Sequence, residues 1–435
     1  MKKTVAFSTF TLKVCSLLPA LLLFVAPVGA QRFPKPDFES GYEYPELRYA
    51  MPSEQLWMLV DVALLVALMS LVAWAVVRRR TRTPVVAASI ISVAYFGFFR
   101  SGCICSVGAI QNVALALADS SYTVPLAALL FFILPIAFTI LFGRVFCAGV
   151  CPLGAIQELV NVRSYRISKA LAAALGVIPW VYLILAVLFA VTRSSFIICR
   201  FDPFIGIFRL GGDIGMIVFG ALLLVAAVFT GRPFCRFLCP YGALLSLFSR
   251  VSVWKAKITP SCISCELCHS ACPVDAIRPP YANKVKESRQ HGVRRVLRYM
   301  ALLPLMAGAG AAALYVASDS LSQTNKSVRL YRMVAQSEVA PQDELSPELE
   351  AFYGQGGTAQ ELSLRVESIQ ADFRRYSAVA GALIGVVIAL SLITLSLKRT
   401  RKTYEISDAA CVSCARCFDY CPKNRVKATE SRISP

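Results

Sequence analysis

The sequence predicts an all-α integral membrane protein with about seven membrane-spanning helices. Of its 435 residues, 57% are hydrophobic and only 16% are charged, which is far more apolar than the composition of a soluble domain. The apolar residues gather into segments that can span a bilayer as helices, alone or with their flanking residues, because a helix satisfies its own backbone hydrogen bonds in lipid. These segments are Leu56–Val77, Pro84–Phe99, Val124–Phe142, Ala170–Val191, Ile214–Phe229, Met300–Val316 and Ala378–Leu397.

The first 30 residues have the pattern of a secretory signal peptide. A basic head is followed by a short apolar run and by Val28-Gly29-Ala30, directly before Gln31. Such a run is short for a membrane span and typical of a signal sequence. An uncleaved membrane anchor is the alternative. Residues 31–55 are then expected to begin the mature protein on the periplasmic side of a bacterial inner membrane.

Basic residues set the expected orientation of the spans. Lysines and arginines cluster in stretches that all fall on one side of the predicted helices: 78–82, 163–169, 232–298 and 398–402. The positive-inside rule makes this side cytoplasmic, with the C-terminus inside. The net charge of +19 is therefore explained by topology, and nucleic-acid binding is not expected. Residues 318–376 become a periplasmic domain, with helical patterning around Leu345–Phe352 and Ala359–Phe373.

Two cysteine runs share one spacing. Residues 262–273 and 411–422 both read C-x₂-C-x₂-C-x₃-C-P, the run that holds a 4Fe–4S cluster and whose fourth cysteine binds the other cluster of a pair. We therefore expect two 4Fe–4S clusters. The first is held by Cys262, Cys265, Cys268 and Cys421, and the second by Cys411, Cys414, Cys417 and Cys272. Structural zinc is a weaker alternative, because this is not the spacing of a zinc ribbon.

A haem site competes with this interpretation and is not expected. Cys265-Glu-Leu-Cys268-His269 is also the C-x-x-C-H pattern of c-type haem attachment. However, Phe418 replaces the histidine in the second run, and such haems are attached outside the cytoplasm, whereas this loop is expected inside. His269 is therefore expected at the surface or beside a cluster.

A second cysteine pattern repeats at the predicted membrane edges. Phe146–Leu159 and Phe234–Leu247 share F-C-x₃-C-P-x-G-A, both after an outside-to-inside span. Cys103–Val113 repeats the G-A-I-Q part of this pattern after a span of opposite direction, and Ile198–Leu210 is a weaker copy with Asp202-Pro203. The repeats predict two parallel hairpin units, related by a pseudo-two-fold axis along the membrane normal.

This arrangement predicts two further groups of side chains. The inner edge would bring together Cys147, Cys151, Cys235 and Cys239, which are enough for another cluster. The outer edge would bring together Cys103, Cys105, Cys199 and Asp202, which could hold a cluster of altered potential. Buried structural or redox-active thiols remain the alternative for the inner group. A disulfide remains the alternative for the outer group.

The motifs divide the chain into the following expected parts: signal peptide 1–30, periplasmic segment 31–55, transmembrane core 56–250 with the repeated hairpins, cytoplasmic ferredoxin half 251–299, transmembrane helix 300–317, periplasmic helical domain 318–376, transmembrane helix 377–397 and the second cytoplasmic ferredoxin half 398–435. The ferredoxin is thus split by two membrane spans. Four basic residues lie near its clusters, and positive-inside topology explains them more simply than donor binding does: Arg236, Lys255, Lys257 and Lys423.

The paired C-x₃-C-P motifs and the two ferredoxin runs resemble the membrane polyferredoxins of the NapH and NosR type. The similarity covers roughly Leu56 to Pro273 and the run Cys411–Pro422. It implies electron transfer, often from quinol, towards periplasmic reductases of respiration or towards their maturation. Two features depart from the family. No flavin-binding domain is evident, and a membrane hairpin separates the ferredoxin runs.

We therefore expect an electron-transfer component rather than a substrate-converting enzyme, with no catalytic residues. Its expected partners are membrane lipid, a cytoplasmic ferredoxin-like donor or quinol, and a membrane or periplasmic acceptor such as a flavoprotein or cytochrome, within a larger complex. A maturation factor for a periplasmic metalloenzyme and a redox-sensing scaffold are the alternatives.

Overall fold

The computed structural model describes residues 55–102, 105–162, 164–259, 262–281, 289–339, 347–354, 356–396 and 401–424. The chain divides into two compact units, residues 1–59 and 60–435. The predicted signal peptide, nearly all of the predicted periplasmic segment 31–55, and Cys103 lie outside the described residues. All described residues belong to the second unit, except residues 55–59, which begin helix α2.

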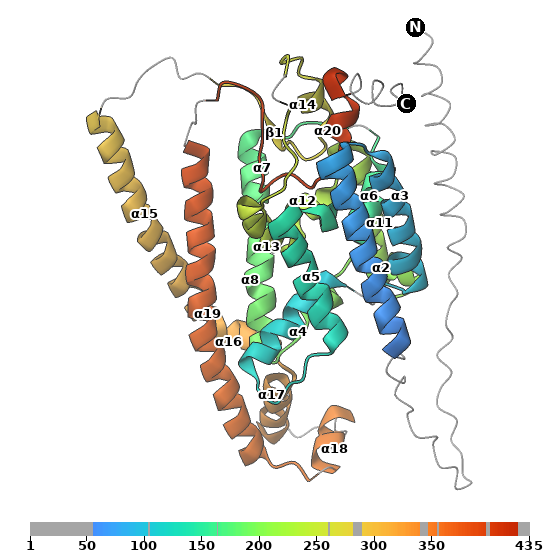
Figure 1. The fold of residues 1–435 in the computed structure, drawn as a ribbon. Helices are drawn as coiled ribbons and strands as arrows, with labels where there is room; N and C mark the ends of the chain where they lie inside the picture. Colours follow the sequence, from blue (N-terminus) through green and yellow to red (C-terminus); the bar gives the residue numbers. More distant parts are fainter. Residues whose placement is uncertain are drawn as a thin grey trace. The chain divides into compact units, whose positions relative to one another are not determined.

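The described chain is almost entirely helical (Figure 1). By length and composition, four of its helices can cross a membrane: Leu56–Arg79, Lys169–Val191, Gln290–Val316 and Ala359–Ser396. Shorter apolar helices occupy Thr83–Phe99, Ser106–Ala118, Leu126–Phe142 and Ile214–Thr230. The expected helical membrane class is therefore supported, and the shorter helices include three of the seven predicted spans.

The first half of the helical core contains three π-helical segments. Its elements are α2 (Gln55–Trp74), η1 (Ala75–Arg79), α3 (Thr83–Ser92), η2 (Val93–Phe99), α4 (Ser106–Ala118), α5 (Leu126–Phe142), η3 (Phe146–Val150) and α6 (Pro152–Val160). The segment η3 carries Cys147 and is buried throughout. Short π-helical segments are rare and occur frequently at functional sites, which directs attention to this turn.

The second half of the described core consists of seven helices and one 3₁₀ turn. Its elements are α7 (Lys169–Leu175), α8 (Ile178–Val191), α9 (Ile197–Arg200), α10 (Ile205–Arg209), α11 (Ile214–Thr230), α12 (Pro233–Phe237), α13 (Pro240–Phe248) and the 3₁₀ turn η4 (Ser249–Val251). In both halves a proline opens the helix that follows the second cysteine, Pro152 in α6 and Pro240 in α13. Proline suits this position because the first helical N–H has no partner within the helix.

Two long helices, α15 (Arg289–Val316) and α19 (Ala359–Ser396), pack against each other (Figure 1). Their contact depends on glycines. A Cβ placed on Gly310 would lie 2.2 Å from the Gly381 carbonyl oxygen, and one on Gly385 would lie 1.9 Å from the Met306 carbonyl oxygen. Small residues at such a contact let two helix backbones approach closely in a membrane.

A small helical group lies at the end of the molecule where α4 also lies, between α15 and α19 in sequence (Figure 1). It comprises α16 (Ser318–Ser322), α17 (Lys326–Val339) and α18 (Pro347–Gly354), and it packs on the start of α19. Its own hydrophobic core contains Val328, Val334, Leu349, Leu362 and Val366. Helix α19 continues without a break past residue 376, where the sequence suggested a domain boundary.

The ferredoxin runs lie at the opposite end (Figure 1). Strand β1 (Ile277–Arg278) pairs antiparallel with β2 (Glu405–Ile406), with Ile277 opposite Ile406. Helices α14 (Leu267–Ala271) and α20 (Arg416–Asp419) contact each other beside this sheet. Because Val274, Val412 and Phe418 share the main hydrophobic core with the membrane helices, the two halves form one body that is seated on the helical core.

Candidate functional site: four groups of cysteines

The first pocket contains cysteines from both ferredoxin runs. It is lined by Cys262, Cys265 and Cys268 from one run and by Cys421 from the other, with Cys417 of that other run also at its wall. Cys268 interacts electrostatically with all three of the others. The structure therefore brings together the four residues that the sequence assigns to the first cluster. Tyr404 closes this region by donating a hydrogen bond of 2.9 Å to Glu266, and its ring lies 5.9 Å from that of His269.

The second pocket has the complementary set. It is lined by Cys411, Cys414 and Cys417 together with Cys272. Cys417 interacts electrostatically with these three cysteines and also with Cys268 of the first pocket. The fourth cysteine of each run therefore lines the pocket of the other run, and the two pockets are adjacent.

The backbone explains how each run encloses its pocket. Ser264 and Glu266 in the first run adopt positive φ of 55° and 63°, and Ser413 and Ala415, at the same positions of the second run, adopt 53° and 60°. Non-glycine residues rarely adopt this conformation. Residues whose backbone conformation alternates between right- and left-handed direct successive N–H groups into one concavity, and iron–sulfur sites use such concavities. In agreement, Ser413 N–H faces Cys411 Sγ at 3.5 Å.

In the second pocket, burial disfavours a thiolate that is not bound to a metal. Burial is the main cause that raises the pKa of Cys411 to about 12 and that of Cys414 to about 11. Iron binds the thiolate and not the thiol. The iron-free pocket therefore holds protonated thiols, and binding of a cluster must release their protons.

The inner-edge cysteines line a third pocket, inside the helical core. Cys147 and Cys151 come from η3 and the turn into α6, and Cys235 and Cys239 come from α12 and the turn into α13. All four line one pocket. Cys147, Cys151 and Cys239 are each at most 8% exposed. The structure thus gathers the predicted inner-edge group.

Hydrogen-bond donors surround these sulfurs. Gly242 N–H faces Cys239 Sγ at 3.3 Å, Gln157 Nε2 lies 3.7 Å from Cys235 Sγ, and Arg144 Nη2 lies 3.8 Å from Cys147 Sγ. Donors of this kind favour the charged form of a thiolate and tune the potential of a bound cluster. The donor set therefore fits a 4Fe–4S cluster: four thiols around a cavity, with polar hydrogens directed at sulfur.

Two arginines that the sequence motifs did not include lie beside the C-x₃-C-P segments. Arg144 Nη2 lies 3.1 Å from a Cβ placed on Gly242, and Arg232 Nη1 lies 3.7 Å from a Cβ placed on Gly154. Each arginine thus approaches the glycine that follows the Cys-Pro pair of the other motif. The signal was available, since the motif extends backwards to G-R-x-F-C in both copies.

Arg232 also belongs to a buried charge network beside the second ferredoxin pocket. Its side chain is fully buried, and its Nε lies 3.0 Å from Glu158 Oε2. Glu158 also pairs with Arg82 at 2.7 Å and with Arg416 of α20 at 3.9 Å. Arg232 interacts electrostatically with both Cys414 and Cys235. The network therefore lies between the second and third cysteine groups.

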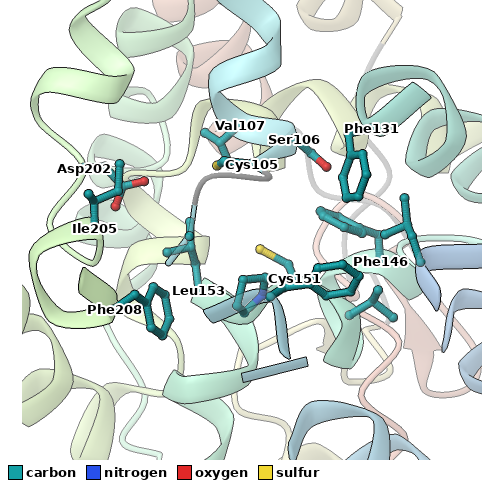
Figure 2. A pocket seen from close by; sticks show the side chains of 15 residues that line it. Cys105, Ser106, Val107, Phe131, Phe146, Cys151, Leu153, Asp202, Ile205 and Phe208 are labelled. Carbon is teal, nitrogen blue, oxygen red and sulfur yellow. The ribbon is translucent and has the colours of Figure 1, made fainter. Parts of the chain in front are cut away.

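The outer-edge group is described in part. Cys105 interacts electrostatically with Asp202 and Cys199. Cys105 and Asp202 line a pocket that Cys151 also lines, and Figure 2 shows these side chains around the same cavity. Cys105 and Cys199 are not joined by a disulfide in the structure. Cys103 lies outside the described residues, and Cys199 is exposed.

No three cysteine, histidine or carboxylate side chains in the described ranges lie close enough together to hold a single metal ion. A single zinc ion needs four ligands at bonding distance from one centre. A 4Fe–4S cube is bound differently, because each thiolate binds a different iron and the sulfurs surround a cavity.

Two families of known proteins match the segments that carry these groups. Residues 124–169 and 213–259 match a model described as a 4Fe-4S binding domain, and residues 257–278 match another with the same description. The first match covers both C-x₃-C-P motifs, and the second covers the run 262–273. The chain therefore contains 4Fe–4S binding domains on a helical membrane scaffold.

Among individual relatives, the regulatory protein NosR of Pseudomonas aeruginosa is 30% identical over 220 residues, which are 46% of this chain and 30% of NosR. The putative electron transport protein YccM of Escherichia coli is 27% identical over 38% of this chain and 52% of YccM. The uncharacterized protein MJ0750 of Methanocaldococcus jannaschii is 28% identical over 41% of this chain and 77% of MJ0750. No solved structure shows significant similarity. The resemblance to iron–sulfur membrane proteins of the NosR type is thus confirmed, although the match covers less than a third of NosR itself.

Proposed function

We propose that the protein relays electrons across the bacterial inner membrane through a series of 4Fe–4S clusters. One observation carries the proposal. Cysteine groups follow one another from the ferredoxin end into the helical core, and a shared residue or electrostatic contact joins each group to the next. Cys417 interacts with Cys268, Arg232 with Cys414 and Cys235, and Cys151 lines both the inner-edge and the outer-edge pockets.

The proposed ligands are those that the pockets gather. Cys262, Cys265, Cys268 and Cys421 hold the first cluster, and Cys272, Cys411, Cys414 and Cys417 hold the second. Cys147, Cys151, Cys235 and Cys239 hold a third, and Cys103, Cys105, Cys199 and Asp202 hold a fourth. Such clusters supply one-electron chemistry over a wide range of potentials. The protein supplies ligation, burial and hydrogen bonds, and excludes water from the inner pocket.

The proposed topology has seven spans in two parallel units, with the ferredoxin runs and the C-terminus in the cytoplasm. The reciprocal reach of Arg144 and Arg232 supports two related units. The position of α17 and α18 at the end opposite the ferredoxin runs (Figure 1) supports a periplasmic location for residues 318–376. The basic stretches support the cytoplasmic assignment of the ferredoxin end.

In this arrangement electrons pass between a cytoplasmic ferredoxin-like donor or quinol and a membrane or periplasmic acceptor, within a respiratory complex. The basic residues near the ferredoxin are in part engaged internally. Arg236 pairs with Asp275 at 2.8 Å and Lys255 with Asp408 at 2.6 Å. Their proposed role is therefore to hold the ferredoxin half on the helical core, which favours the topological explanation over donor attraction.

The deciding experiment measures iron and acid-labile sulfide per chain after anaerobic purification, with EPR of the reduced sample. About eight irons would correspond to two cubes and confine the redox centres to the ferredoxin. About twelve to sixteen irons, with additional EPR signals that disappear in Cys147→Ser and Cys239→Ser, would establish clusters in the membrane core. Iron unchanged in these variants would reject the inner-edge cluster.

A redox-sensing role is the second candidate. NosR, a relative of this chain, is a regulatory protein. Residues 318–376 have a separate hydrophobic core, which provides a surface for a partner. Deletion of that region should then abolish partner binding while electron transfer to dyes continues. A relay that needs this region only for stability would lose both together.

A further inference from the structure

One described cavity near the cysteine groups is not a cluster pocket. It has a volume of about 420 Å³ and lies among α7, α8, α12, α13 and the ferredoxin halves. Only one cysteine, Cys235, lines it. Its volume falls within the range of small-molecule sites. We propose that this cavity binds an amphiphilic ligand that carries a phosphate group.

The charge of the cavity is the first argument. Four arginines but only one carboxylate, that of Asp275, line the cavity. Asp275 is already paired with Arg236 at 2.8 Å. The arginines are Arg144, Arg236, Arg250 and Arg278. A guanidinium group presents donors in a planar fork that matches phosphate oxygens, and several such groups commonly bind one phosphate.

Two buried donors that lack partners are the second argument. Arg144 is 5% exposed, and although its Nη1 donates to the Ala409 carbonyl at 3.1 Å, its Nε has no hydrogen-bond partner within the described ranges. Arg236 Nη1 is likewise buried without a partner there. Buried donors are rarely left unsatisfied, because each loses its hydrogen bonds to water without a replacement. A ligand oxygen in the cavity would satisfy them.

The remaining wall explains why the ligand should be amphiphilic. Helices α7 and α8 and the turn between them contribute Ala172, Gly176 and Trp180, and α12 contributes Phe237. This wall is apolar and partly aromatic, so it suits an acyl chain or a ring more than it suits water. A free phosphate ion would leave most of the volume unfilled. The phosphate is therefore attached to a larger apolar body.

Two sources share this chemistry, a phospholipid headgroup of the cytoplasmic leaflet and a soluble nucleotide. Isothermal titration calorimetry on the delipidated full-length protein in detergent would separate them. The probes are dihexanoyl phosphatidylglycerol and adenosine 5′-monophosphate, with dihexanoylglycerol and adenosine as matched compounds without phosphate. Binding of the first probe alone identifies a lipid site, and binding of the second alone identifies a nucleotide site.

The variants test the location. Arg236→Gln and Arg250→Gln should each weaken binding of the phosphate-containing probe at least tenfold. Arg166 is an exposed arginine outside the cavity, so Arg166→Gln should leave binding unchanged. Arg250 is exposed, so its replacement keeps the test valid if Arg236→Gln disturbs the fold. Iron content and visible spectra of each variant confirm that the ferredoxin is intact. Absence of saturable binding by both phosphate probes, or equal binding by all variants, would overturn the proposal.

Discussion

The buried pair of Arg232 and Glu158 should be among the strongest stabilising contacts of the helical core. The Arg232 side chain is 0% exposed and that of Glu158 is 3% exposed, with Nε and Oε2 3.0 Å apart. Arg232 also donates to the carbonyl oxygens of Cys147 and Ala148. Replacement by Gln leaves a buried carboxylate without this partner and two carbonyls without donors. Removing one partner of a buried pair costs about 3–5 kcal/mol.

A matched variant separates this effect from a general loss of charge. Arg82 contacts the same carboxylate at 2.7 Å, but its side chain is 21% exposed. Solvent screens such a pair, so Arg82→Gln should cost only about 0.5–1 kcal/mol. The comparison of the two variants therefore measures the contribution of burial at one carboxylate.

The assay is reversible unfolding in mixed detergent micelles, followed by tryptophan fluorescence and cluster absorbance. The double variant Glu158→Gln with Arg232→Gln removes both charges, so it should be less destabilised than the sum of the single variants by at least about 2 kcal/mol. Additivity within about 0.5 kcal/mol, or equal losses for Arg82→Gln and Arg232→Gln, would refute the reasoning.

Three further outcomes follow from the structure. Cys421→Ser should alter the EPR signal of the cluster that Cys262, Cys265 and Cys268 hold, and Cys272→Ser that of the other, whereas the reverse assignment would contradict the exchange seen in the pockets. Gly381→Ala should destabilise the α15–α19 contact by about 1–3 kcal/mol, because its Cβ would lie 2.1 Å from the Gly310 carbonyl oxygen; Gly308→Ala, with open space around it, is the control that should be neutral in thermal unfolding. The iron-free protein should lose stability as pH rises from about 8.5, the pKa of an unfolded thiol, because burial raises the folded pKa of Cys414 to about 11 and of Cys411 to about 12. Chemical denaturation at pH 7.5 and 10 would show this loss in the iron-free protein alone, and an equal loss in the iron-loaded protein would contradict it.

The sequence by itself determined the class of the protein and the residue types of its sites. Apolar segments of bilayer length require helices, because the backbone has no other partner in lipid. The spacing of the two ferredoxin runs is equally local, since one short loop must place three thiolates around a cube. The resemblance to NosR-type proteins rested on these local patterns, and the comparisons confirmed it.

Only the tertiary structure decided which charged residues are buried beside the cysteines. The sequence already assigned Cys421 to the run 262–268, and the structure adds the pairing of β1 with β2, which lies between the two runs in space. The roles of Arg144, Arg232 and Glu158 were missed because a charged residue in a basic loop looks the same in sequence whether it faces water or lies buried. Burial is set by the packing of several helices at once, and no local pattern records it.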